Sequence, residues 1–229
     1  MLYASTKRGF KRFSMKVRPG QQTVRIHLPV NIASKAAGAK VIASSAGSLN
    51  RDALIDGTEN TNWGGVNGDG TSVDRRHPFV VVDLAGQRAR PIHRVQVSAM
   101  LRPTTSSEPV PLAQDPDSGS RFTAVRKFAL EACVRNCGAA GAHWTRFYTS
   151  PGNAFPAVAP RPVAPNLTLR GFNVRDVRAA AIRFVVLENQ CSGTPDYAGE
   201  QDNDPTNDTD CKAASDRDSI SHAAELQVY

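Results

Sequence analysis

Apolar and polar residues alternate over short stretches of this chain, and long helical periodicity is absent. Alternation with a period of two is typical of a β-strand with one buried face. Strands are predicted at 79–84, 92–98, 127–134, 144–149, 182–187 and 224–229. Several short strands separated by turn residues indicate an all-β sandwich.

The first 30 residues predict a separate basic β-hairpin. Phe13, Met15 and Val17 alternate with polar residues, Pro19-Gly20 marks a turn, and alternation resumes over 24–28. Residues 1–51 contain no Asp or Glu, so this arm contributes much of the net charge of +7. The arm is either a hairpin packed on the main domain, the last hairpin of a preceding domain, or a grip for anionic partners. With so few aromatic residues among its charges, nucleic acid is not the favoured partner.

The octapeptide 56–63, Asp-Gly-Thr-Glu-Asn-Thr-Asn-Trp, is the densest cluster of oxygen donors near an apolar run. Gly57 permits a tight turn because it has no Cβ to clash at positive φ. A bent loop of carboxylate, hydroxyl and carbonyl oxygens suits Ca²⁺, and Trp63 would pin the loop to the core. An ordinary Asx-turn followed by a core tryptophan explains the same residues. Both interpretations stay open on the octapeptide alone.

Composition favours a globular, loop-rich protein. The 229 residues include 40% hydrophobic residues, 15 Pro and 17 Gly, enough to bury a sizeable core. No apolar run approaches the roughly 20 residues of a membrane helix. No secretion signal is expected within this chain, because no apolar segment follows the basic N-terminal residues.

Four cysteines occur, an even number that suits two disulfides in an oxidising compartment. The pairs Cys133–Cys137 and Cys191–Cys211 are expected, although four cysteines allow three pairings. A four-thiolate zinc site fits the spacing poorly.

An acidic stretch lies between the last two cysteines. Asp202, Asp204, Asp208 and Asp210 alternate with polar residues, so their mutual repulsion favours a bound cation in a compact form. A second calcium site and a solvated acidic loop are both consistent with this pattern.

Glycines crowd the segment 64–70, which predicts an exposed loop without regular structure. The segment ends in Asp74-Arg75-Arg76-His77. Arg75, Arg76 and His77 are candidate contacts for a sugar or an anion, or else form a solvated charge cluster. Arg102 and Arg121 flank a long loop and are further candidates. Trp144 opens a strand and is either a stacking platform for a sugar or a packed core residue.

Four motifs in order resemble the discoidin, or coagulation-factor (F5/8) type C, domain, also called the galactose-binding-like jelly roll. They are Asn31-Ile32-Ala33, the octapeptide 56–63, the Val-Asp-Leu strand at 82–84 and the closing Ala-Glu-Leu-Gln-Val-Tyr at 224–229. The resemblance covers residues 31–229 and includes many bacterial carbohydrate-binding modules. Further segments, such as 98–103 and 148–151, resemble accessory domains of secreted bacterial proteins, including fungalysin-type metallopeptidases.

The resemblance implies a structural Ca²⁺ beneath the octapeptide. By position its ligands would be Asp56, Thr58, Thr61, the carbonyl of Ala224, and Glu225, so the ion would join an early loop to the last strand. Thr58 stands where the family commonly has Asp or Asn. The resemblance also implies that residues 176–181 form a loop, and that loops at one end of the barrel bind ligand.

No pattern for catalysis stands out. The five histidines are scattered without a nucleophile signature, and the metallopeptidase motif His-Glu-x-x-His is missing from the sequence. We therefore expect a secreted, non-catalytic, calcium-stabilised module that binds a glycan or cell-surface ligand, with a role in cell adhesion or beside a parent enzyme. The alternative is a structural module that docks on another protein through its basic arm.

Overall fold

The computed structural model describes residues 2–6, 9–13, 20, 29–86, 88–101, 119–156, 166–194, 211 and 217–229. The strands are β1 (Leu2–Thr6), β2 (Gly9–Phe13), β3 (Lys40–Ser44), β4 (Trp63–Val66), β5 (Phe79–Asp83), β6 (Arg90–Ser98), β7 (Val125–Cys133), β8 (Thr145–Thr149), β9 (Arg170–Ala179), β10 (Ala181–Asn189), β11 (Ile220–Ala223) and β12 (Glu225–Val228). The helices are short: η1 (Lys35–Ala37), η2 (Arg51–Ile55), η3 (Arg121–Thr123), α1 (Gln190–Gly193) and η5 (Arg217–Ser219).

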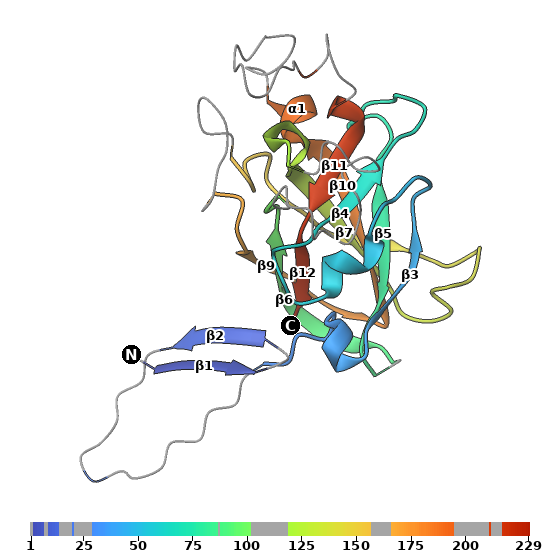
Figure 1. Cartoon of the computed structure of the whole chain (residues 1–229). Coiled ribbons are helices and arrows are strands. Elements are labelled where there is room, and N and C mark those ends of the chain that lie inside the picture. The colour runs from blue at the N-terminus through green and yellow to red at the C-terminus, as the bar shows by residue number, and fades with distance from the viewer. Residues whose placement is uncertain are drawn as a thin grey trace.

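Two antiparallel layers form a sandwich (Figure 1). One layer is a five-stranded sheet in the order β3-β5-β10-β7-β8. The other consists of the ladders β12-β6-β9 and β11-β4. Ala224 joins β11 to β12 and donates its N–H to the Ser98 carbonyl at 2.8 Å, so the two ladders continue as one wall. The predicted all-β sandwich is confirmed.

The core lies between the layers because alternate residues of each strand point inward. In β10 the inward side chains Ile182, Phe184 and Val186 are fully buried. Phe128 of β7 packs against four aromatic rings, among them Phe184 with the ring centroids 5.4 Å apart. Trp63 meets Phe184 edge-on at 6.1 Å. The prediction that Trp63 anchors its loop to the core is confirmed, because the residue has no exposed surface.

The two ends of the sandwich differ. At the end that we call the terminal end, the Ile32 N–H donates to the Val228 carbonyl and Tyr229 closes the last strand. At the opposite end, called the loop end, lie α1, η5 and the segment 67–77 (Figure 1). Since β5 and β7 both run antiparallel to β10, both start at the loop end, whereas β8 starts at the terminal end.

Several sequence-based expectations about local structure were wrong. Residues 176–181, expected to form a loop, contain the end of β9, which pairs with β6. Residues 64–66, expected to be part of an exposed glycine-rich loop, belong to β4, in which Gly64 and Gly65 are buried. The glycines here make room for neighbours: a Cβ on Gly65 would lie 2.6 Å from the Trp63 ring and 2.8 Å from the Pro78 Cβ.

The described part of the N-terminal arm contains a β-hairpin at 2–13 that the sequence did not predict. Leu2 pairs with Phe13 and Thr6 with Gly9, forming a separate two-stranded sheet. The predicted hairpin around Pro19-Gly20 stays a prediction. Gly20 lies in a turn at φ +81°, while the predicted strands over 14–18 and 24–28 lie outside the described residues.

Both expected disulfides are present. Cys133 and Cys137 have their Cα atoms 5.7 Å apart, and Cys191 and Cys211 have theirs 5.2 Å apart. Both distances fall in the usual range for a disulfide. The described part of the chain contains no free cysteine.

Replacing Gly65 with Ala should destabilise the protein by about 1–3 kcal/mol, because the added methyl group overlaps the Trp63 ring and Pro78. Chemical denaturation measures the change. Gly68→Ala is the matched control, since a Cβ at Gly68 meets nothing within 4 Å. Equal stability of the two variants would contradict the packing described for β4.

Candidate functional site: a buried carboxylate and a polar hollow

Glu225, the first residue of β12, joins the last strand to the loop at 56–61. Its Oε2 accepts a hydrogen bond of 3.0 Å from the Gly57 N–H. Gly57 has φ +89°, the left-handed conformation that turns this N–H toward β12 and that favours glycine. Asp56 holds the rest of the loop, since its Oδ1 accepts from the Thr58 N–H at 3.0 Å and its Oδ2 from the Thr61 hydroxyl at 2.6 Å.

Glu59 makes the second connection between this loop and the wall. Its Oε1 accepts from the Ser98 hydroxyl at 2.5 Å and from the Leu169 N–H at 2.9 Å. Ser98 pairs with Glu225 across β6 and β12, so the loop covers this part of the three-stranded sheet. Within the octapeptide, Glu59 was predicted only to be one of several oxygen-bearing residues. Its partners lie 39 and 110 residues away, which no local pattern reveals.

The Glu225 carboxyl group is buried to an unusual degree, with 1% of the residue exposed. Burial is the main cause that raises its pKa, to about 8, while the nearby charges of Asp56 and Glu59 add to the effect and the Gly57 N–H opposes it. Its Oε1 atom is buried and has no hydrogen-bond partner within the described part of the chain. A buried carboxylate oxygen without a partner is costly, so this position favours a proton or a cation.

Asp56 contacts the Thr58 N–H and the Thr61 hydroxyl, and Glu225 contacts the Gly57 N–H next to Asp56, so these predicted metal ligands belong to one loop and the start of the strand that it meets. Ala224 precedes Glu225 in the chain. In the described part of the chain, no three Asp, Glu, His or Cys side chains are grouped so as to hold a metal ion. A cation here would therefore also need hydroxyl and carbonyl oxygens, which Ca²⁺ accepts. The second predicted set, Asp202, Asp204, Asp208 and Asp210, lies outside the described residues.

A polar hollow of about 330 Å³ opens at the loop end. Its lining is almost entirely polar and consists of Asp69, Gly70, Thr71, Ser72, Asp74, Arg75 and Asp218. The Thr71 N–H donates to Asp69 at 3.1 Å and is the main cause that lowers the pKa of that carboxyl, with Arg76 contributing. Asp69 is therefore ionised at neutral pH.

Two remote segments build this hollow. The Val73 N–H donates to the Asp218 carbonyl at 2.8 Å, and the Asn67 N–H to the Ser219 carbonyl at 3.0 Å. Asn189 fixes η5 from the other side, because its amide donates to the carbonyls of Arg217 and Ile220 at 2.7 and 2.5 Å.

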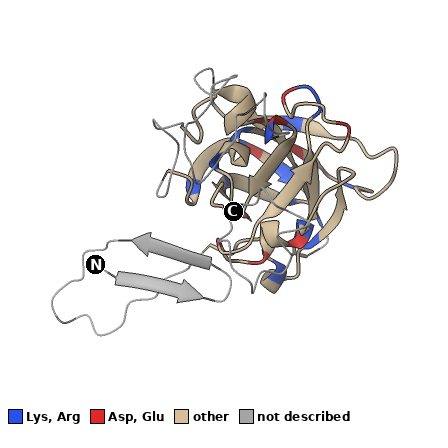
Figure 2. Ribbon diagram, turned by 45° about the horizontal axis from the view of Figure 1, so that its top comes forward, with Lys and Arg blue, Asp and Glu red and all other residues tan. Residues whose placement is uncertain are grey.

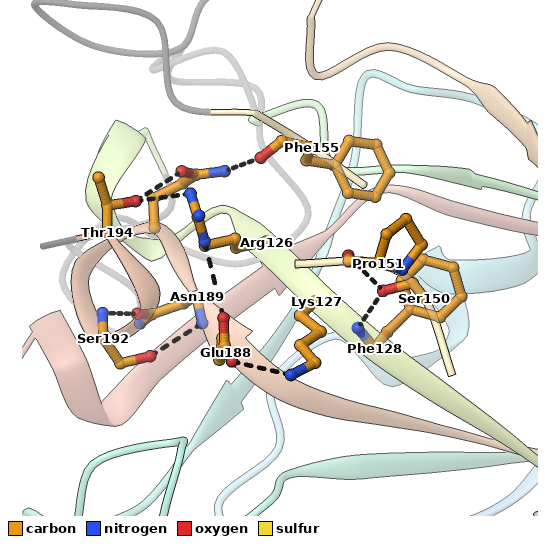
Figure 3. A network of polar contacts seen from close by, with 11 residues as sticks. Arg126, Lys127, Phe128, Ser150, Pro151, Phe155, Glu188, Asn189, Ser192 and Thr194 are labelled. Atoms are coloured by element: carbon orange, nitrogen blue, oxygen red, sulfur yellow. Dashed lines mark hydrogen bonds and ion pairs between the residues drawn. The ribbon is translucent and has the colours of Figure 1, made fainter. Parts of the chain in front are cut away.

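Asn189 belongs to a wider polar network beneath the loop end (Figure 3). Its side chain accepts from the Ser192 N–H at 2.7 Å and so caps α1. Beside it Glu188 pairs with Lys127 at 3.1 Å and with Arg126 at 3.6 Å. Hydrogen bonds of Asn189 thus link η5, which carries Asp218 of the hollow, to α1.

The predicted ligand contacts are divided between the two ends. Arg75 lines the hollow. Arg76 instead forms an ion pair with Asp69, and the His77 Nδ1 lies 2.8 Å from the Val73 carbonyl oxygen. Arg121 starts η3 and is half-buried, and Arg102 lies outside the described residues.

Trp144 does not join these residues, because it precedes β8 and so lies toward the terminal end. It is half-buried on the outer face of the five-stranded sheet. The Arg183 guanidinium lies 5.0 Å from the centre of its ring and 5.6 Å from that of Phe79. Arg183 also pairs with Glu131, which Arg146 contacts from β8. The ring of Trp144 thus packs against the guanidinium group of Arg183.

Charges of both signs are interspersed over the body of the protein (Figure 2). The cationic side chains of the N-terminal arm lie outside what the structure describes, so its partner stays a prediction. Among the described residues, no helix has both the length and the apolar character needed to cross a membrane.

Comparisons in sequence give no match, either to a protein-family model or to a curated protein. Solved structures do match. The carbohydrate-binding module CBM32-3 of a family 31 glycoside hydrolase from Clostridium perfringens aligns with a TM-score of 0.52 and 17% identity, over 83% of this chain and 90% of that one. A protein fragment from Bacteroides thetaiotaomicron aligns at 0.49 and 16%, over 90% and 95%. The family 32 module of NanJ from C. perfringens, solved with galactose, aligns at 0.42 and 12%, over 83% and 90%.

The first of these matches supports the fold that the sequence motifs predicted. The protein is a galactose-binding-like jelly-roll β-sandwich, the fold of carbohydrate-binding modules of this type.

The buried Glu225 makes stability depend on pH. Its pKa is 4.5 in a free carboxyl and about 8 in the folded protein, so the folded state holds a proton that the unfolded state loses. In the presence of a chelator, the free energy of unfolding should fall by a few kcal/mol as pH rises from about 5 to about 8. Denaturation curves across this range measure the effect.

Glu225→Gln should flatten this dependence, because an amide does not titrate. The control is Asp52→Asn, which removes an exposed carboxylate on η2 that has only a lysine as its ion-pair partner among the described residues. A pH dependence that survives unchanged in Glu225→Gln would show that another group is responsible.

Proposed function

We propose that this protein is a non-catalytic, calcium-stabilised module that binds carbohydrate in the hollow at the loop end. The observation that carries the proposal is the hollow itself, a polar depression of about 330 Å³ on a fold shared with a carbohydrate-binding module of a glycoside hydrolase.

The hollow has the chemistry that sugar hydroxyls need. Asp69, Asp74 and Asp218 supply acceptors, and Arg75 supplies donors in a planar fork. A sugar hydroxyl both donates and accepts, so adjacent acidic and basic groups can bind it from two sides. The hydroxyl groups of Thr71 and Ser72 add further partners.

Calcium would act as a structural ion at Glu225. The orphaned Oε1 of this buried carboxylate supports a cation, and Asp56, Thr58, Thr61 and the Ala224 carbonyl would complete the oxygen set. When bound, the ion would neutralise the carboxylates and tie the 56–61 loop to β12.

This role would place a parent enzyme or an assembly at a glycan-bearing surface outside the cell. Two disulfides suit an oxidising compartment. The relation to accessory domains of fungalysin-type metallopeptidases and the protein-docking role of the basic arm stay predictions from the sequence.

Arg75→Gln should weaken binding of the preferred glycan roughly tenfold, because a hydrogen bond from a charged donor is lost. A glycan array identifies the ligand, and calorimetry measures the affinity. The control is Arg170→Gln, which removes the same charge from an exposed site on β9. A lack of any glycan ligand, or equal losses in both variants, would contradict the proposal.

Calcium should raise the thermal midpoint of unfolding. At a calcium concentration a hundred times its dissociation constant, the free energy of unfolding should increase by about 3 kcal/mol. Glu225→Gln should remove this response and should be more stable than the parent in chelator at pH 8, since no buried charge remains. Asp52→Asn should keep the full response. A calcium response that persists in Glu225→Gln would place the ion elsewhere.

A further inference from the structure

A second hollow, of about 360 Å³, lies at the terminal end of the sandwich. The end of β7, the segment leading into β8 and the end of β9 form its walls. Its volume falls in the lower part of the range of roughly 300–1,000 Å³ that is typical of ligand pockets. The hollow at Arg75 lies at the opposite end, so the two are separate.

The polar groups of this hollow are cationic or neutral. Arg135, His143 and Arg178 line it together with Thr145, and no carboxylate is among its lining residues. The nearest acidic residues in the adjoining strands have other partners. Glu131 binds Arg146 and Arg183, and Asp176 binds His93 at 2.8 Å. The hollow therefore presents a positive potential that no neighbouring lining group neutralises.

The remainder of the lining is apolar. Ala132, Val134 and Val177 contribute to it. Val134 is 56% exposed, the largest exposed fraction of any large hydrophobic residue in the described part of the chain. An exposed valine beside two guanidinium groups suits a ligand that has both a charge and an apolar face.

One covalent bond and one hydrogen bond restrain parts of this site. The Cys133–Cys137 disulfide closes a short loop that carries Val134 and Arg135. The Arg178 Nη2 donates to the Ala89 carbonyl at 2.8 Å, which restrains the guanidinium group. Because a guanidinium has several N–H donors, others can bind a ligand. Ordering a preformed site costs less on binding than ordering free side chains.

We propose that this hollow is a second ligand site, specific for a compact ring that carries a carboxylate or sulfate group. Arg135 and Arg178 bind the anionic group through charge-assisted hydrogen bonds, with His143 and Thr145 beside them. The ring packs on Val134 and Val177. This proposal goes beyond glycan binding at the loop end and does not depend on it.

The test uses three matched probes, galacturonic acid, galactose 6-sulfate and neutral galactose, in calorimetric and NMR titrations of the whole chain. We expect both acidic probes to bind, galactose to bind at least tenfold more weakly at this site, and affinity to fall with salt. The two acidic probes separate a carboxylate ligand from a sulfate ligand.

Arg135→Gln and Arg178→Gln should each weaken binding of the acidic probe roughly tenfold. Arg170→Gln makes the same change of charge on the strand that contains Arg178, and it should leave binding of the acidic probe unchanged. Shifts of the His143 ring signals on titration locate the ligand independently of the variants.

Three results would overturn the proposal. The first is that neither acidic probe binds, and the second is that galactose binds this site as tightly as the acidic probes do. The third is that binding of the acidic probes is lost in Arg75→Gln but kept in the Arg135 and Arg178 variants. Because Arg75→Gln tests the loop-end hollow, failure of one site is distinguishable from failure of the other.

Discussion

One hydrogen bond, from the Gly57 N–H to the buried carboxyl group of Glu225, joins parts of the chain that are 168 residues apart. The strand that contains Glu225 is the last of the sandwich, and among the described strands it pairs with β6 alone. The 56–61 loop covers it from outside, through Glu225 and through Glu59 on Ser98. The wall therefore depends on a contact in which an acidic group is removed from water, and its charge must be balanced by a proton or a cation.

The same wall positions the loop-end hollow. The β4–β11 ladder runs from Trp63 opposite Ala223, two residues before Glu225, to Val66 opposite Ile220, two residues after Asp218 of the hollow. Beyond it, the Val73 N–H bonds the Asp218 carbonyl, which brings the two rims together. A cation at Glu225 would thus support the loop-end hollow indirectly, through this pair of short strands.

Sequence patterns predicted the sandwich, the buried Trp63 and both disulfides, because alternation and cysteine spacing are local signals. They failed for β4, where glycines serve close packing instead of flexibility. They also did not reveal that the direction of β8 places Trp144 and Arg75, two predicted ligand contacts, at different ends of the sandwich. The side of the hollow formed by Asp218 depends on a hydrogen bond to Val73, a residue far away in the sequence. No local sequence pattern predicts such a contact.

Amide hydrogen exchange at Gly57 is the most direct test of this account, because that N–H is the donor to Glu225. We predict slow exchange in the free protein and slower exchange with calcium, as the carboxylate and the loop become one ordered unit. Exchange at the rate of an unstructured peptide, unaffected by calcium, would show that the loop and the last strand are not joined.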